Sequence, residues 1–96
     1  MTITELVEKA HANAVEKGFW DKEHETGTLL SLIHSEVSEA LEADRQEDFD
    51  GFAEELADIC IRVFDLAGGK NIDLQAEIER KMELNRIRPK MHGKAY

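Results

Sequence analysis

Apolar residues recur every three or four positions along most of the chain, which is the spacing of one face of an α-helix. The only proline, Pro89, lies near the C-terminus, so no earlier helix is interrupted by one. We therefore expect an all-α chain without internal repeats, forming one domain over residues 1–96. The pattern predicts four helices, over residues 3–17, 29–45, 48–67 and from 74 to a point before Pro89.

Capping residues delimit these predicted helices. Thr2 and Glu5 have the spacing of a capping box, and Gly18 suits the end of the first helix. Asp73 has the position of an N-cap for the fourth helix. Residues 18–27 are then expected to be a loop. The expected architecture is a bundle of four helices.

The third predicted helix is apolar over an unusually wide arc and must be covered on most sides. A chain of 96 residues buries only ~60–65% of its unfolded surface, so one copy has little material to cover it. We therefore expect the core to be completed by oligomerisation, as a homodimer or homotetramer. Cys60 lies on this arc and is expected in the core. The arc comprises Phe49, Phe52, Leu56, Ile59, Cys60, Val63, Phe64, Leu66 and Ala67.

Two acidic pairs lie on consecutive long helices, each pair one helical turn apart. Glu36 and Glu39 belong to the second helix, and Glu55 and Asp58 to the third. Glu36 falls inside the apolar arc of its helix, where a carboxylate is costly to bury unless it is paired or binds a metal ion. Carboxylate oxygens from several residues are the ligands that Mg²⁺ requires. The four residues are therefore predicted to hold Mg²⁺, with Mn²⁺ as a substitute, and to carry the catalysis.

The acidic pairs also have a simpler interpretation. Taken singly, Glu39, Glu55 and Asp58 fit a solvated helix edge, with an ion pair between Asp58 and Arg62 four residues later. That interpretation leaves Glu36 unexplained.

A row of basic and amide residues follows on the fourth helix. Asn85 lies in its apolar stripe, flanked by Lys81 and Arg88, and Lys94 follows in the tail. These residue types can bind the phosphates and the base or sugar of a nucleotide, although a basic last turn also complements the helix dipole. Trp20 is a candidate for stacking on the base, or for closing the end of the bundle.

Charge and cysteine content exclude some classes of protein. The formal charge is −9, and residues 80–96 carry six Lys and Arg against one Glu, which leaves −14 on the remainder. Such an acidic body argues against binding a nucleic-acid polymer and favours a metal-complexed phosphate compound. A single cysteine fits a reducing compartment. With no export signal or long apolar run, we expect a cytoplasmic protein without a membrane partner.

The ordered set of motifs resembles the MazG-like, all-α nucleoside triphosphate pyrophosphohydrolases. It reads "EVSE", fifteen residues, "ELAD", and then "KMELN" leading into "RIRPKMHGK", with "KGFW" before the acidic helices. The resemblance implies a MazG-like bundle whose active site is completed by a second subunit. By the same resemblance, Glu36, Glu39, Glu55 and Asp58 are Mg²⁺ ligands, and Lys81 and Asn85 contact the nucleotide.

The implied activity is hydrolysis of a nucleoside triphosphate between the α and β phosphates, which gives a nucleoside monophosphate and pyrophosphate and clears non-standard or excess nucleotides. Two alternatives stay open at this point. One is a related hydrolase of dUTP or phosphoribosyl-ATP, and the other is a catalytically silent helical module that binds a nucleotide or a protein.

Overall fold

The computed structural model describes residues 1–89, which form four α-helices and one short 3-10 helix, with no strand in that range. This confirms the all-α prediction. The α-helices are α1 (Ile3–Glu16), α2 (Thr26–Arg45), α3 (Phe49–Gly69) and α4 (Leu74–Ile87), and the 3-10 helix η1 (Phe19–Asp21) lies between α1 and α2.

The predicted capping residues act as expected. Thr2 Oγ1 accepts a hydrogen bond from the Glu5 amide at 3.1 Å, and Glu5 Oε1 accepts one from the Thr2 amide at 2.8 Å. The Asp73 carboxylate accepts from the Ala76 amide at 3.1 Å and starts α4. Gly18 follows α1 with φ of 88°, a backbone conformation that glycine adopts without steric cost.

The observed structure differs most from the prediction between α1 and α2. The second helix begins at Thr26, three residues before the predicted start, and Glu25 precedes it without a capping side chain. Residues 19–21 of the expected loop form η1 instead. The start was missed because no side-chain cap marks it.

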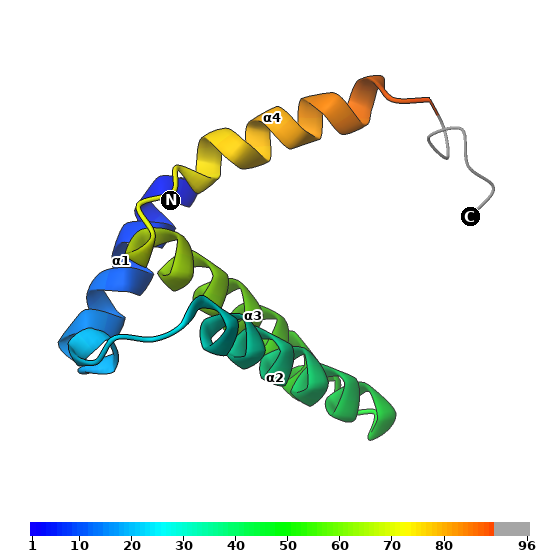
Figure 1. Cartoon of the computed structure of the whole chain (residues 1–96). Coiled ribbons are helices and arrows are strands. Elements are labelled where there is room, and N and C mark those ends of the chain that lie inside the picture. The colour runs from blue at the N-terminus through cyan, green and yellow to red at the C-terminus, as the bar shows by residue number, and fades with distance from the viewer. Residues whose placement is uncertain (90–96) are drawn as a thin grey trace.

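Helix α3 is the centre of the packed part of the chain, because both α1 and α2 pack against it (Figure 1). Its last turn comes very close to α1 and η1. A Cβ at Gly68 would lie 2.6 Å from His11 Cβ, and one at Gly69 would overlap the six-membered ring of Trp20. Two consecutive residues without side chains therefore allow the N-terminal segment to approach α3.

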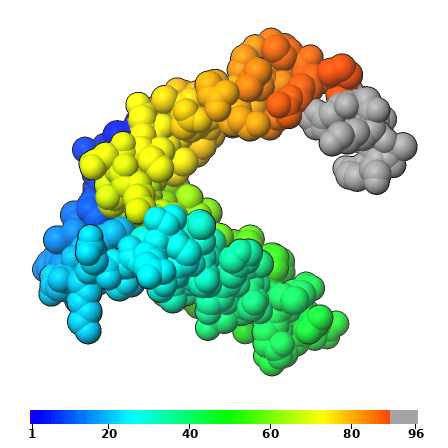
Figure 2. Space-filling model, viewed as in Figure 1, coloured from blue at the N-terminus to red at the C-terminus, as the bar shows by residue number. Residues whose placement is uncertain are grey.

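Helix α4 leaves this packed body as an arm. Its first turn is tied to α1, where the Thr4 amide donates to Gln75 Oε1 at 3.0 Å. Beyond this point α4 diverges from α2 and α3, and open space separates α4 from that helix pair (Figures 1 and 2). The radius of gyration is 15.9 Å, against about 12–13 Å for a compact domain of this length. The fourth helix therefore does not close a bundle within one chain.

The core of a single chain is correspondingly small. The buried apolar residues are Val7, Leu29, Ala40 and Ala67. Cys60 is exposed, contrary to expectation, and Phe49 on the predicted arc of α3 is 79% exposed. These residues lie on parts of α3 that neither α1 nor α2 covers. Apolar patterning identified the faces that suit burial but not which of them this chain itself buries.

Candidate metal centre

The antiparallel packing of α2 on α3 brings three of the four predicted ligands together. Glu36, Glu39 and Glu55 each offer a carboxylate oxygen, and these oxygens all lie within 4.8 Å of one another. Asp58 does not belong to this close set, although it lies one turn after Glu55 on α3. Glu36, Glu39 and Glu55 are called the glutamate triad below.

Glu36 has a cationic partner. Arg62 Nε donates to Glu36 Oε1 at 3.0 Å, joining α3 to α2. The hydrogen bond from Arg62 is the largest influence on Glu36 and lowers the pKa of its carboxyl, outweighing the opposing effect of burial. The alternative pairing of Arg62 with Asp58 is therefore wrong: the guanidinium reaches across to the neighbouring helix rather than along its own. This cross-helix pair explains how Glu36 is tolerated in an apolar stripe.

The other two members of the triad lack such a partner. Removal from water is the largest influence on Glu55, followed by the charge of Glu39, and together they raise the pKa of Glu55. The pKa of Glu39 is raised as well, first by its side-chain hydrogen bond to Glu36 and then by the charge of Glu36. The charge of Asp58 raises both values further, so Asp58 lies close enough to act on the triad. The centre therefore holds more negative charge than Arg62 compensates.

One oxygen of the triad is both buried and unpaired. Among residues 1–89, Glu55 Oε2 has no hydrogen-bond partner, and the atom is buried. A buried carboxylate oxygen without a partner is costly, and a cation coordinated there would remove that cost. The residues present therefore fit a divalent metal ion with oxygen ligands.

A hollow of about 320 Å³ adjoins the triad. It lies between α1, η1 and α3, and it reaches α2 at Glu36. Its lining combines small apolar side chains of α1 with charged groups of α2 and α3. An organic ligand in the hollow would therefore lie next to the glutamate triad. The lining residues are Ala10, Asn13, Ala14, Phe19, Glu36, Asp58, Ile61, Arg62 and Asp65.

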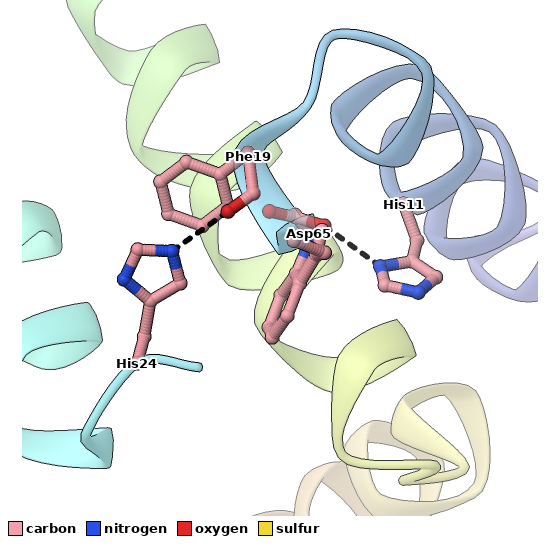
Figure 3. Close-up of polar contacts among 5 residues, drawn as sticks. His11, Phe19, His24 and Asp65 are labelled. Atoms are coloured by element: carbon pink, nitrogen blue, oxygen red, sulfur yellow. Dashed lines mark hydrogen bonds and ion pairs between the residues drawn. The ribbon is translucent and has the colours of Figure 1, made fainter. Parts of the chain in front are cut away.

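A polar network fixes η1 at the edge of this hollow (Figure 3). Asp65 Oδ1 accepts from Trp20 Nε1 at 2.8 Å and lies 2.9 Å from His11 Nδ1. His24 Nε2 lies 2.7 Å from the carbonyl oxygen of Phe19, and the His24 ring stacks on Phe19 with centroids 4.5 Å apart. The indole of Trp20 is thus held against α3, as expected for a residue that closes the end of the bundle. Its role in substrate binding stays a prediction.

Sequence reasoning missed the partnership of Asp65 with His11 and Trp20. A signal was present, because Glu55, Asp58, Arg62 and Asp65 recur three and four residues apart along one strip of α3. The strip showed which residues share a face, whereas the packing of α1 against it was needed to show which residues meet.

The predicted nucleotide-binding row lies elsewhere in the chain. Lys81, Asn85 and Arg88 are exposed on α4 or at its C-cap, on the arm that diverges from α2 and α3 (Figure 1). Lys94 lies outside the described residues. Within residues 1–89 of one chain, Lys81, Asn85 and Arg88 are therefore not brought to the carboxylates.

No protein-family model, curated protein or solved structure matches this chain. Within residues 1–89, none of the helices is both long enough and apolar enough to cross a membrane.

Proposed function

We propose that this protein is a Mg²⁺-dependent nucleoside triphosphate pyrophosphohydrolase, which cleaves the bond between the α and β phosphates. The observation that carries the proposal is the glutamate triad, in which Glu55 Oε2 is buried without a partner beside two other carboxylates. The resemblance of the ordered motifs to the MazG-like family adds the reaction and the products, a nucleoside monophosphate and pyrophosphate.

Glu36, Glu39 and Glu55 would hold the metal ion, and Asp58 stands one turn away to complete the set through a second ion or a water molecule. Mg²⁺ bound there would supply a Lewis acid for the phosphate chain and lower the pKa of water. Among the chain's own residues, one of the glutamates would accept the proton from that water. The hollow beside Glu36 and Asp58 has room for part of the substrate.

In this proposal a second copy of the chain completes the site. The arm α4 carries Lys81, Asn85 and Arg88 away from its own triad, and its apolar residues Met82 and Ile87 are 66% and 61% exposed. Packed in a dimer or tetramer, such an arm would cover the apolar surface of a neighbouring α2–α3 pair and bring positive charge to its carboxylates. The substrates would be non-standard or excess nucleotides in the cytoplasm.

The bond that breaks provides the test. Purified protein with Mg²⁺ is incubated with a panel of standard and damaged nucleoside triphosphates, and orthophosphate is measured with and without added inorganic pyrophosphatase. We expect a nucleoside monophosphate in both reactions. Orthophosphate should appear only when pyrophosphatase is present. Orthophosphate released equally fast in both reactions would mean that the terminal bond is cut and that the proposal is wrong.

A further inference from the structure

Within residues 1–89, Arg62 is the one basic side chain that lines the hollow beside the glutamate triad. The α2–α3 pair, residues 26–69, carries eleven Asp and Glu but only two Arg, and the other, Arg45, lies in the last turn of α2. Of the cations that sequence patterning assigned to substrate phosphates, Lys81 lies on α4 and Arg88 at its C-cap. Positive charge for an anion next to the triad is therefore available from Arg62 within the same chain.

The guanidinium of Arg62 is only partly used by the contacts within residues 1–89. Its Nε holds Glu36 Oε1 at 3.0 Å, and no hydrogen bond within that range involves its two terminal nitrogens. The side chain is 37% exposed, whereas that of Glu36 is 14% exposed. Arginine presents five N–H donors in a planar fork, so one edge can stay on a carboxylate while terminal N–H groups bind phosphate oxygens.

We propose that Arg62 binds a phosphate group of the substrate in the hollow beside the triad, while its Nε stays on Glu36. In this arrangement one residue joins the metal centre to the phosphate chain. The assignment rests on the proposed function, because it takes the triad to be a metal site. It adds a phosphate-binding residue on α3 that belongs to the same chain as the carboxylates.

The charges around the hollow make this binding depend on the metal. The lining contains Glu36, Asp58 and Asp65 against Arg62 alone, so an anion is repelled while the triad is free of metal. A divalent cation on the triad offsets this excess of negative charge and places a positive ion next to Arg62. We therefore expect inorganic pyrophosphate to bind in the presence of Mg²⁺ and not in the presence of a chelator.

The test compares wild type, Arg62→Gln and Arg62→Lys by isothermal titration calorimetry, first with Mg²⁺ alone and then with inorganic pyrophosphate at saturating Mg²⁺. Arg62→Gln should weaken pyrophosphate binding by about tenfold to a hundredfold, because a charge-assisted contact is lost. Mg²⁺ binding alone should be retained or tightened, because a competing positive charge is removed. Arg62→Lys keeps the charge but cannot serve both partners at once, so its loss should be intermediate.

The matched control is Arg80→Gln, which removes an exposed ion pair with Glu77 on α4 and should leave both affinities unchanged. Circular dichroism establishes whether each variant is folded. If Arg62→Gln does not fold, Arg62→Lys still provides the test, because its positive charge retains an attraction to Glu36. Pyrophosphate affinity that is equal in wild type and both Arg62 variants, with Mg²⁺ binding intact, would overturn the role of Arg62 alone. Mg²⁺ binding that is absent from wild type would overturn the proposed function with it.

Discussion

Helices α3 and α4 both carry an apolar stripe and a polar row, yet their environments differ. Helix α3 has neighbours on two sides, and its polar strip meets partners from α1 and α2, through Arg62 with Glu36 and Asp65 with His11. Helix α4 contacts α1 near its start and then extends with Met82 exposed. The comparison teaches that the same kind of sequence pattern encodes an internal packing surface in α3 and, in our proposal, an external one in α4.

Glu55 and Glu54 allow the sharpest test of the α3 side of this comparison. They are neighbours of identical chemistry, but Glu55 belongs to the triad whereas Glu54 is exposed. We expect Glu55→Gln to reduce turnover of nucleoside triphosphates by about a hundredfold to a thousandfold, because an anionic ligand is lost from the proposed metal site. Glu54→Gln should retain wild-type turnover.

The measurement is the initial rate of pyrophosphate release at saturating Mg²⁺, together with Mg²⁺ affinity by calorimetry. Equal activity of Glu55→Gln and Glu54→Gln would remove the triad from the reaction and leave α3 with a packing role only.

A mixing experiment tests whether the α4 arm serves the neighbouring chain. Lys81→Ala should lower kcat/KM by about tenfold to a hundredfold, because in our proposal Lys81 balances charge that grows as pyrophosphate leaves. When this variant is mixed with an equal amount of Glu55→Gln and the subunits exchange in a dimer, one intact site forms in each mixed dimer. Activity should then recover to about a quarter of wild type.

The control for the mixing experiment is each variant alone at the same total concentration. An activity of the mixture equal to the mean of the two separate activities would show that Lys81 and the triad act within one chain. Helix α4 would then not contribute to the site of a neighbouring subunit.

The smallest expected effect concerns stability and pH in the metal-free protein. The pKa values of Glu39 and Glu55 are raised by folding from an ordinary value of 4.5, so their contribution to stability is full below that value and is lost as pH rises through the folded pKa. Glu36 acts in the opposite sense: its folded pKa is lowered, so its contribution is present above the ordinary value and is lost as pH falls through the folded one.

Thermal unfolding in the presence of a chelator checks the direction in which stability changes with pH. Between pH 5 and neutrality, wild type should lose stability relative to Glu55→Gln, because the repulsion at Glu55 develops only in wild type. Added Mg²⁺ at pH 7 should stabilise wild type more than the variant, since a ligand that binds only the folded state raises its stability. Parallel pH curves for the two proteins would contradict the raised pKa of Glu55.

Much of the fold followed from local patterns in the sequence. The capping box of Thr2 and Glu5 and the N-cap at Asp73 depend on residues three apart, so spacing alone reveals them. The convergence of Glu36 with Glu55 was also predicted, because acidic pairs on two consecutive helices, with Glu36 in an apolar stripe, pointed to a shared metal ion. Both predictions rest on positions within one helix or between adjacent helices.

The remaining features depend on tertiary geometry that periodicity does not carry. The alternative interpretation paired Arg62 with Asp58 because the two are four residues apart. The side chain of Arg62 instead reaches α2, where its partner Glu36 is only 14% exposed. The helical face of Cys60 predicts a place in the core, although no helix within residues 1–89 covers that face. Asp65 shows the same limit, since its partners His11 and Trp20 are more than forty residues away in sequence.

The two glycines that end α3 have a consequence for how freely the sequence can change. In a helix, replacing Gly by Ala ordinarily gains about 1 kcal/mol, so selection for stability alone would remove both. Here a methyl group at Gly68 would collide with His11, and one at Gly69 would collide with Trp20. Such a substitution is tolerable only together with a smaller residue on the facing segment. In a library of random variants, positions 68 and 69 should therefore accept change only as members of pairs, with 11 and 20 as their partners.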